Sequence, residues 1–491
     1  MPARSGEQFL KGLRARNREV WLGDERVDDV TTHPQLEGAA DSLARVFDIQ
    51  QEFADECLMP DPETGEAINV SHMIPRSIDD LKRRHRGLRR IAESTVGIMG
   101  RTPDYMNVTF AGFAGERGAW LGPEGKNEQG HDNLRNYQKM IAREDLSLTH
   151  TIVHPTIDRV KDASFAGNPV PLHKVGETST GIIVRGARIL ATLAPFADET
   201  AIYPGLPLPA DASSDYALSF ALPMDTPGLI FMCRDSAATV GSNSFDHPLS
   251  SRFDEQDAFT IFDDVEVPHE RVFINGDIDV YNSVMGPTAW WANIMQQTTI
   301  RALTKLEFAY GLALRMAEAV NDNSAPTIEM LGELSCYVEV TRSAILLSEE
   351  HAYDRGDGVI FPDGRPMHPM RALLAAWYPR VREILMLIGS HNLLATPSQA
   401  MFSDARLRPL IEEFVHGANG MDAERRASIY RLAWDFIGSA LGSRNELYER
   451  NYLGSAKTTR THHTLLYSDR EAATALVETM LGQVSAGANA T

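Results

Sequence analysis

Three side chains of this 491-residue chain could bind and ionise a small polar molecule: Arg101, Tyr105 and His150. Arginine is a permanent cation with a planar fork of donors, which suits a developing oxyanion. Tyrosine can donate or accept a hydrogen bond at a similar reach. Histidine ordinarily titrates near neutral pH and can take a proton. The first two lie in residues 94–110, STVGIMGRTPDYMNVTF, where a polar helix is interrupted before the chain becomes apolar again.

Each of these residues also has a purely structural interpretation. Arg101 could form an ion pair with Asp104, which lies close to it in the sequence, and Tyr105 could belong to the core. His150 could be a buried histidine with satisfied hydrogen bonds, and His154 competes with it for any proton-transfer role. The residue types by themselves leave both interpretations open.

The chain lacks the short motifs that mark several common classes of enzyme. It has no G-x-G-x-x-G after a strand, no phosphate-binding Walker loop, no H-E-x-x-H and no G-x-S-x-G. Cys57, Cys233 and Cys336 are far apart, and His462 and His463 are adjacent, which is poor geometry for one metal ion. We therefore expect no metal site.

Three blocks of different texture divide the chain. Residues 1–145 are expected to form an N-terminal helical domain. Residues 146–275 contain short runs of β-forming residues separated by Pro, Gly, Asp and Ser, which predict an antiparallel sandwich or small barrel. Residues 276–491 return to the helical period and are expected to form a bundle that also makes subunit contacts. The fold class is therefore α+β.

One long helix is expected to lead to the interrupted segment. It begins at a capping box formed by Ser77 and Asp80, and its apolar stripe continues to Met99. Gly100 and Pro103 are expected to end it, because glycine suits a helix C-terminus and proline restricts the residue before it to extended geometry. The break would point the arginine and the tyrosine that follow into a cavity.

Two local signals predict boundaries further along the chain. The dipeptide Arg185-Gly186 within TGIIVRGARILATLAP is typical of a turn between two strands. Pro287 and Pro326 are each expected in the first turn of a long helix.

The composition of the chain indicates which binding partners and which cellular compartment to expect. The net charge of −20 disfavours nucleic-acid binding, because an acidic surface repels phosphate backbones. Three separated cysteines indicate a reducing compartment rather than a disulfide framework. No signal peptide and no apolar run of about 18 residues is present, so we expect a cytoplasmic protein without a membrane span.

Several longer strings of the chain, taken in order, resemble one family. They are VDDVTTHP (27–34), GRTPDY (100–105), NLRNYQKM (133–140), LTHTIVHPTIDR (148–159), ATLAPFADE (191–199), FDHPLSSRFDE (245–255), IFDDVEVPHERVF (261–273) and GSRNELYERNY (442–452). Together they resemble the oxygenase component of the 4-hydroxyphenylacetate 3-monooxygenase type. The resemblance spans nearly the whole chain.

The resemblance implies a fold, a cofactor and partners. It implies an N-terminal helical domain, a middle antiparallel β-barrel and a C-terminal helical bundle, similar in architecture to acyl-CoA dehydrogenases and usually assembled as a homotetramer. It implies that a separate NAD(P)H:flavin reductase supplies reduced FAD, which reacts with O2. The resulting C4a-hydroperoxyflavin would convert a 4-substituted phenol to a catechol, so the site must draw the phenol toward phenolate and exclude water.

The same resemblance implies roles for individual residues. Three of them are expected to surround the substrate hydroxyl: Arg101, Tyr105 and His150. The intervening residues are expected to contribute to substrate binding: Thr102, Pro103 and Asp104. Flavin contacts are expected from His150, Thr151, Ile152, Thr156, Ile157, Asp158, Arg159, Thr192, Leu441, Gly442, Ser443 and Arg444. Arg159 is a candidate partner for a flavin phosphate or ring edge, glycine at 442 would allow close backbone approach to the cofactor, and Ser443 could equally be a helix cap.

The chain departs from the family at the substrate tail. Where the family can place a Ser-Thr pair that contacts the substrate carboxylate, this chain has Gly205 and Leu206, neither of which has a donor side chain. Two options remain open: backbone N–H groups bind the carboxylate, or the substrate is a less polar phenol.

Three alternative functions compete with the one that the resemblance implies. A 4-hydroxybutyryl-CoA dehydratase needs cysteine ligands near the first motif, and GIMGRTPDY has none. An acyl-CoA dehydrogenase-like flavin oxidase needs a glutamate base, which the sequence does not place. A non-catalytic helical scaffold would be favoured by loss of Arg101 or His150, and both are present.

Overall fold

The computed structural model describes residues 3–116, 118–158, 167–209 and 211–488. Its N-terminal part is mainly helical, with α1 (Gly6–Arg14), α2 (Glu37–Glu52), α3 (Ala54–Cys57), α4 (Ile78–Ser94), α5 (Pro103–Gly115) and α6 (Glu128–Glu144). It also contains short strands that the sequence did not reveal: β1 (Glu19–Leu22), β2 (Glu25–Arg26), β3 (Leu58–Pro60) and β4 (Ala67–Asn69). Strands this short carry too little alternation to be recognised from sequence.

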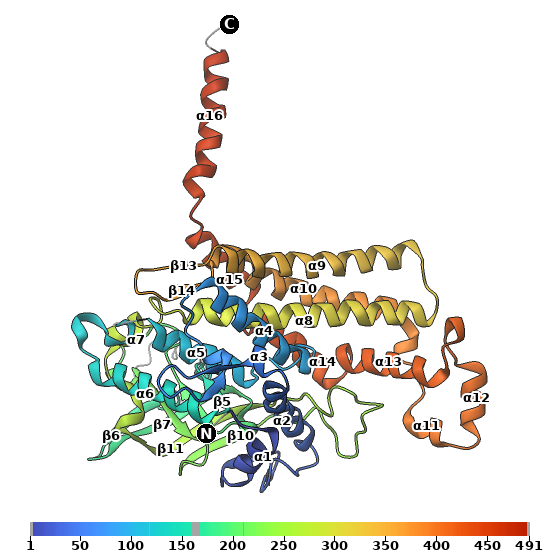
Figure 1. Cartoon of the computed structure of the whole chain (residues 1–491), viewed down its shortest axis with the longest axis horizontal. Helices are drawn as coiled ribbons and strands as arrows, with labels where there is room; N and C mark the ends of the chain where they lie inside the picture. Colours follow the sequence, from blue (N-terminus) through green and yellow to red (C-terminus); the bar gives the residue numbers. More distant parts are fainter. Residues whose placement is uncertain (1–2, 117, 159–166, 210, 489–491) are drawn as a thin grey trace.

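The middle of the chain is the β-rich part of the protein (Figure 1), and its strands form two sheets. Their strands are β5 (Leu148–Thr151), β6 (His173–Glu177), β7 (Gly181–Thr192), β8 (Glu199–Ile202), β9 (Leu218–Pro223), β10 (Leu229–Cys233), β11 (Asp257–Pro268) and β12 (Val272–Asn275). One sheet has the order β2-β1-β10-β11-β7-β6 and the other the order β12-β9-β8-β5. Neither sheet closes within the described residues, so the predicted antiparallel β-barrel is wrong.

The pairing is also not purely antiparallel, because β1 pairs with β10 and β5 with β8 in parallel. The β1–β10 pair ties the N-terminal segment into the middle sheet. Parallel pairs join segments far apart in the chain. The local patterns that predicted hairpins therefore could not reveal them.

The predicted turn at Arg185-Gly186 is instead a distortion within one strand, β7. Gly186 has φ +121°, and a Cβ there would lie 2.6 Å from the carbonyl oxygen of Pro171. Opposite it, the register with β11 shifts between Phe262 and Val265, which is a β-bulge. Arg185 forms ion pairs with both bulged residues, Asp263 at 3.0 Å and Asp264 at 2.7 Å. The glycine thus marks a bulge, which uses the same backbone freedom as a turn.

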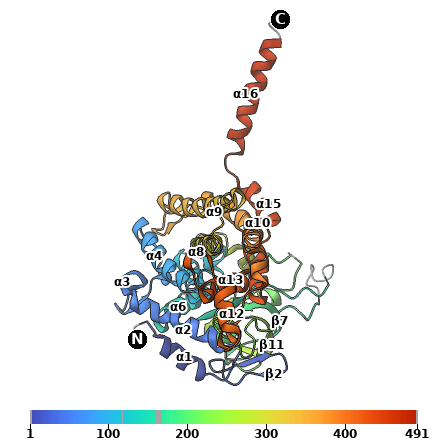
Figure 2. The same cartoon turned by 90° about the vertical axis from the view of Figure 1, so that its right-hand side faces the viewer.

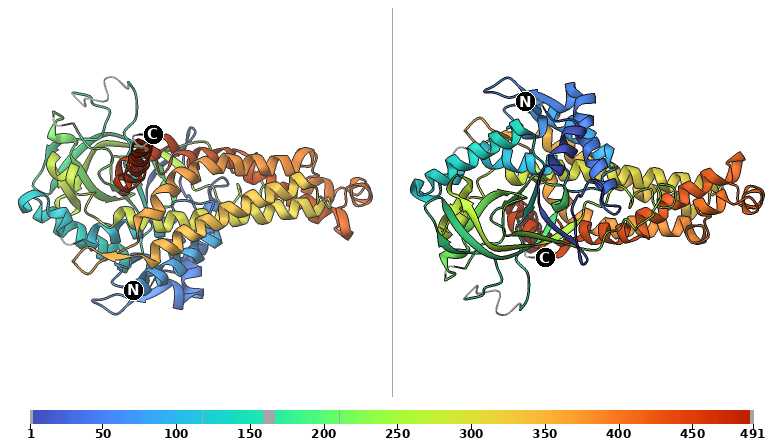
Figure 3. Two further views of the ribbon diagram at one scale, coloured as in Figure 1. Left: turned by 90° about the horizontal axis from the view of Figure 1, so that it is seen from above. Right: turned by 90° about the horizontal axis from the view of Figure 1, so that it is seen from below.

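The rest of the chain is a helical bundle with a small hairpin of β13 (Tyr353–Asp354) and β14 (Ile360–Phe361). Its helices are α7 (Ile278–Ser283), α8 (Trp290–Ala319), α9 (Ala325–Glu350), α10 (Gly364–Gly389), α11 (Gln399–Ser403), α12 (Leu407–Phe414), α13 (Ala423–Ile437), α14 (Ala440–Asn451), α15 (Ala456–Leu466) and α16 (Arg470–Ala488). Pro326 lies in the first turn of α9 as predicted, whereas Pro287 precedes α8 by three residues. Figure 3 shows the long helices side by side, extending beyond the sheets.

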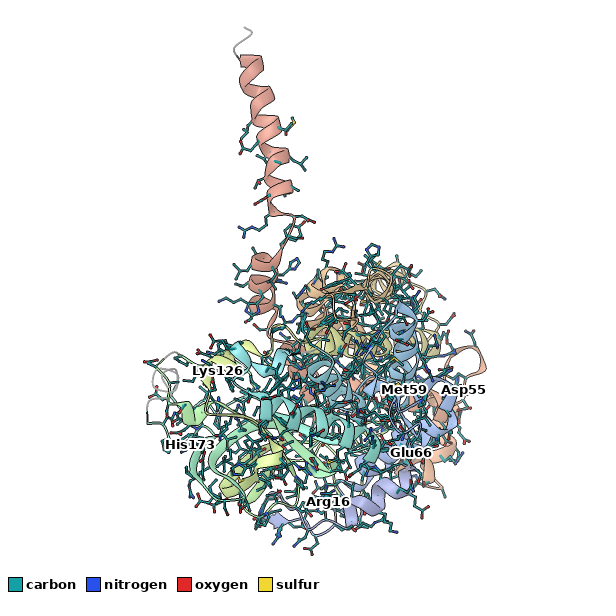
Figure 4. All side chains as sticks on the ribbon, turned by 60° about the vertical axis from the view of Figure 1, so that its left-hand side comes forward. Arg16, Asp55, Met59, Glu66, Lys126 and His173 are labelled. Carbon is teal, nitrogen blue, oxygen red and sulfur yellow. The ribbon has the colours of Figure 1, made fainter. Side chains whose placement is uncertain are left out.

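The last helix, α16, stands away from the body of the protein (Figures 1 and 2). Its apolar side chains are largely exposed, among them Leu476 (72%), Val477 (57%) and Met480 (59%). Figure 4 shows its side chains projecting from the helix with no neighbouring element over them. No helix among the described residues is long and apolar enough to cross a membrane.

The connection between α4 and α5 differs from the predicted helix end. The Ser77 hydroxyl accepts a hydrogen bond from the Asp80 N–H at 3.1 Å, so this half of the predicted capping box is present. The Asp80 carboxylate, however, accepts from the Arg76 N–H and not from Ser77. α4 ends at Ser94, because the chain reverses through two left-handed residues, Val96 (φ 45°) and Gly97 (φ 70°). The predicted end at Gly100 and Pro103 is therefore wrong, and the proline begins α5.

Candidate active site

A cavity of about 380 Å³ lies where the α4–α5 connection, the end of β7 and α14 meet. Its wall combines charged, aromatic and apolar side chains from distant parts of the chain. They are Arg101, His150, Ile152, Val153, Ile189, Leu190, Thr192, Asp257, Arg444, Leu447, Tyr448, Asn451 and Tyr452. Of the three side chains proposed first from the sequence, Arg101 and His150 line this cavity and Tyr105 does not.

Arg101 is buried among tyrosine rings. Its guanidinium carbon lies 3.8 Å from the centre of the Tyr105 ring and 5.5 Å from the centres of the Tyr448 and Tyr452 rings. Such cation–π contacts stabilise a desolvated cation. Burial alone would lower the pKa of this guanidinium, but the surrounding tyrosine hydroxyls and Glu255 raise it above the ordinary value. Within the described residues its Nη1 has no hydrogen-bond partner, so a donor next to the cavity is available.

The alternative ion pair between Arg101 and Asp104 is not formed. The Asp104 carboxylate accepts a hydrogen bond from Gln297 Nε2 at 3.0 Å, on α8 and away from the cavity wall. Burial raises the pKa of Asp104 to about 6. Thr102 and Pro103 are also buried, as the N-cap and first residue of α5. None of these three residues lines the cavity.

His150 is held between two tyrosine rings. Its ring stacks on Tyr105 with centroids 5.3 Å apart and on Tyr203 with centroids 5.5 Å apart. Burial, and secondarily the positive charge of Arg101, lowers the pKa of His150 well below its ordinary value of 6.5. The expectation that this histidine titrates near neutrality is therefore wrong, and its imidazole is neutral at pH 7. Its Nδ1 has no hydrogen-bond partner among the described residues, which leaves the ring able to accept a proton.

The buried neutral histidines should make the free energy of unfolding depend on pH in the acid range. Burial lowers the pKa of His72 to about 3, and His150 is lowered in the same direction. The folded state then binds fewer protons than the unfolded state, so the free energy of unfolding should fall as the pH drops below about 6.5. Each such group changes that free energy by up to about 1.4 kcal/mol per pH unit. Urea unfolding at a series of pH values between about 7 and 5 measures the slope.

A variant separates this effect from other acid transitions. His72→Phe removes one titrating ring, and the dependence of unfolding free energy on pH should become shallower. Asp104 acts in the opposite sense, because its raised pKa makes protonation below about 6 stabilising in the folded state. An unchanged slope in His72→Phe would show that His72 does not contribute to the pH dependence of stability.

Arg444 and Thr192 meet at a carboxylate on the cavity wall. Asp257 accepts hydrogen bonds from Arg444 Nε at 2.8 Å and Nη2 at 2.7 Å, and from the Thr192 hydroxyl at 2.7 Å. Arg234 Nε donates to the same carboxylate at 2.9 Å. Burial would raise the pKa of Asp257, but Arg444 and Arg234 lower it well below its ordinary value. The wall thus carries fixed charges with fixed orientations.

A second buried ionic cluster lies behind the tyrosines. Glu449 accepts from Arg301 Nη1 at 2.8 Å and from Lys305 Nζ at 2.6 Å. Arg301 Nη2 also donates to the Tyr452 hydroxyl at 2.9 Å. The Tyr452 ring stacks on Tyr448 with centroids 4.6 Å apart and an interplanar angle of 7°. This cluster therefore fixes the two rings that face Arg101.

Two glycines in the predicted motifs are explained by close packing. A Cβ on Gly100 would lie 2.1 Å from the Tyr448 hydroxyl, so only glycine lets that ring approach the connection. A Cβ on Gly442 would lie 2.8 Å from the backbone of Ile437, at the end of α13. The group that lies close to Gly442 is therefore the backbone of α13.

The remaining predicted residues lie at varied places. The Thr151 hydroxyl donates to the Ile189 carbonyl, Leu441 is buried, and Ser443 is exposed on α14. Ser439 forms the helix cap once considered for Ser443. Thr156 and Ile157 are exposed and Asp158 is half-buried, and none of the three lines the cavity. Arg159 lies outside the described residues.

The predicted tail-binding pair, Gly205 and Leu206, is exposed, with Leu206 at 86%. A Cβ on Gly205 would lie 2.8 Å from the carbonyl oxygen of Ile152, a residue of the cavity wall. The backbone N–H of Gly205 donates to the Tyr281 hydroxyl at 3.4 Å. The pair therefore borders the cavity wall without lining the cavity.

Sequence reasoning missed several residues of the site: Tyr203, Glu255, Asp257, Tyr448 and Tyr452. Two of the resembling strings contain Glu255, Tyr448 and Tyr452. Their presence in those strings was a signal that could have been followed residue by residue. Within the described residues no group of acidic, histidine and cysteine side chains is arranged to hold a metal ion.

Comparison with known proteins covers almost the whole chain. The family model for the 4-hydroxyphenylacetate 3-hydroxylase N terminal matches residues 5–274, and that for the C terminal of the same hydroxylase matches residues 282–482. The 4-hydroxyphenylacetate 3-monooxygenase oxygenase component of Thermus thermophilus is 37% identical over 454 residues, covering 92% of each chain. The oxygenase component of a 4-nitrophenol 2-monooxygenase from a Rhodococcus species is 33% identical, covering 94% of this chain and 88% of the relative.

A solved structure matches the whole fold. It is a crystal structure of the oxygenase component of 4-hydroxyphenylacetate 3-monooxygenase complexed with FAD and 4-hydroxyphenylacetate. It has a TM-score of 0.91 and 34% sequence identity, and covers 99% of this chain and 100% of that chain.

Proposed function

Because this chain belongs to the 4-hydroxyphenylacetate 3-hydroxylase family, we propose that it hydroxylates a 4-substituted phenol, such as 4-hydroxyphenylacetate, beside the phenol hydroxyl. It is the oxygenase component of a two-component, FAD-dependent monooxygenase. A separate reductase supplies the reduced flavin. The observation that carries the site assignment is the buried Arg101 guanidinium, with an unpaired donor, beside the neutral imidazole of His150.

The cavity wall fits a flavin and a phenol together. Apolar side chains of Ile152, Val153 and Leu447 suit a planar ring system, while Thr192 and Arg444 offer oriented polar groups. We assign these five residues to flavin binding. His150, Thr151, Leu441, Gly442 and Ser443 are assigned to the same role. The roles of Thr156, Ile157, Asp158 and Arg159 as flavin contacts stay a prediction. When bound, reduced FAD supplies the electrons that activate O2 for transfer of one oxygen atom to the ring.

The residues of the chain prepare the phenol for that transfer. Arg101 presents a fixed cation to the phenol oxygen, which favours the phenolate and makes the neighbouring ring carbon electron-rich. His150 is neutral and can accept the phenol proton at its unpartnered Nδ1. Because its lowered pKa makes it a weak base, this transfer depends on Arg101 stabilising the phenolate. Tyr105 holds both groups, lying against the guanidinium and the imidazole. The buried aromatic surroundings exclude water, which would otherwise divert the reaction to H2O2.

The test of this function is a single-turnover experiment. The protein is mixed anaerobically with reduced FAD and then with aerated buffer containing 4-hydroxyphenylacetate, and catechol and H2O2 are quantified. We expect catechol formation that depends on the protein. Flavin oxidation at the rate found in free solution, without catechol, would refute the function.

The tail of the substrate gives a separate prediction. Leu206 offers no donor, so Leu206→Thr should add a hydroxyl next to the cavity wall and strengthen carboxylate binding. We expect KM for 4-hydroxyphenylacetate to fall by roughly threefold to tenfold, the range for one partly solvated hydrogen bond to a charged group. Steady-state kinetics with 4-ethylphenol is the matched control, because that phenol lacks the carboxylate. Equal changes for both phenols would show that position 206 does not contact the tail.

Assembly is a further part of the proposal. We propose a homotetramer, with the exposed apolar side chains of α16 supporting contacts between copies. Light scattering at several protein concentrations measures the mass, and a monomer would refute this part.

A further inference from the structure

Glu255 connects two elements of the cavity wall that are distant in sequence. It is 1% exposed and lies two residues before β11. Its Oε2 accepts hydrogen bonds from the backbone N–H groups of Gly100 and Arg101, both at 2.9 Å. Its Oε1 accepts from Arg444 Nη1 at 2.7 Å. One carboxylate thus ties the α4–α5 connection to α14.

The two ends of this bridge depend on Glu255 unequally. Arg444 donates two further hydrogen bonds to Asp257, so it keeps an anchor without Glu255. The Arg101 guanidinium has no ion pair among the described residues, its Nη1 has no hydrogen-bond partner there, and three tyrosine rings lie against it. Rings attract a cation over a broad area and do not fix it at one point. The position of Arg101 is therefore set by its backbone.

That backbone lies in a segment without regular secondary structure. The chain from Thr95 to Thr102 lies between α4 and α5, where the N–H groups of Gly100 and Arg101 have no helical acceptor. Buried N–H groups need an acceptor, and a charged oxygen is a strong one. Glu255 is that acceptor for both residues. The Tyr448 hydroxyl packs closely against Gly100 and restricts the same segment.

We propose that Glu255 is a positioning residue, which holds the Gly100–Arg101 backbone so that the Arg101 guanidinium points at the phenol. The proposal rests on the proposed function for the identity of the ligand. The proposal predicts different effects on phenol binding and on flavin binding. Loss of Glu255 should weaken phenol binding and ionisation, and should change flavin binding much less, because Asp257 still holds Thr192 and Arg444.

The first test measures phenol binding without flavin. The probe is 4-nitrophenol, whose colour reports ionisation of its hydroxyl and whose oxygenation is the activity named for one relative. In Glu255→Ala we expect its dissociation constant to rise on the order of tenfold to a hundredfold, the loss that a small misplacement of a binding group causes. The apparent pKa of the bound probe should rise as well. Glu255→Gln keeps one oxygen for the backbone N–H groups and should recover part of the affinity.

The matched control is Glu199→Gln. Glu199 is also buried, at 2% exposed, and accepts from Tyr137 and Arg271, neither of which lines the cavity. It should lower the melting temperature without changing probe binding more than about twofold. Equal probe binding in the Glu255 variants and in this control would overturn the proposal. If Glu255→Ala does not fold, the comparison of Glu255→Gln with Glu199→Gln decides in the same way.

A second readout needs no ligand. Hydrogen exchange of a peptide covering residues 94–110 should quicken in Glu255→Ala and not in Glu199→Gln, because the Gly100 and Arg101 N–H groups lose their acceptor. Unchanged exchange would overturn the role of Glu255 whatever the substrate is. Faster exchange with a wild-type protein that binds no phenol would instead refute the proposed function and keep the structural bridge.

Discussion

Arg101→Ala is expected to fold and to lose phenol hydroxylation by a factor on the order of 100 to 1,000, as removal of one preorganised oxyanion donor does. The fold should survive because the guanidinium makes no ion pair among the described residues, so no carboxylate is left buried and unpaired. The reaction should fail because, in the proposed mechanism, this donor is the cation that faces the phenol oxygen. Catechol formation in single turnover, with circular dichroism and the melting temperature, measures both halves.

Arg101→Lys is the informative companion variant. Lysine keeps the charge but has a compact ammonium in place of the planar fork that lies 3.8 Å from the Tyr105 ring. Its rate should fall between those of the wild type and Arg101→Ala. An alanine variant that retains more than about a tenth of the wild-type rate would exclude Arg101 from stabilising the phenolate.

His150→Phe is expected to show the second large effect. Phenylalanine preserves a flat ring between Tyr105 and Tyr203, so the stacking at 5.3 Å and 5.5 Å can persist and the melting temperature should change little. The variant lacks a proton acceptor, and catechol formation should fall on the order of 100-fold to 10,000-fold. Stopped-flow measurement of 4-nitrophenol ionisation in the protein, together with product analysis, tests this loss.

The pH dependence separates His150 from other groups. Because the pKa of His150 is well below 6.5, its neutral form persists as the pH falls through that value. In the wild type, kcat/KM, which reports the free enzyme, should therefore show no loss near pH 6.5 from this residue. A drop of kcat/KM centred near that pH in the wild type, absent in His150→Phe, would show that the imidazole is more exposed to water than its burial indicates.

Some of the fold could be predicted from local sequence. Ser77 signals a helix start, Pro326 signals the first turn of α9, and both appear where predicted, because capping and proline geometry depend on neighbours a few residues away. The end of α4 was misplaced because Val96 adopts φ 45°, a conformation that its residue type does not announce. Gly186 was assigned to a turn because a turn and a bulge both need a glycine of unusual φ.

Local patterns and the motif resemblance were enough to predict the family, the alternation of helical and β-rich blocks, and the candidate trio of Arg101, Tyr105 and His150. What surrounds that trio, and which of its sequence neighbours lie off the cavity wall, depends on tertiary packing. Glu255 reaches the Arg101 backbone across 154 positions of the chain, and Asp104, three residues from Arg101, bonds to Gln297 on α8 instead. The physical reason is that propensity and capping act within a turn or two, whereas the charge and burial of a site arise from segments that packing alone brings together.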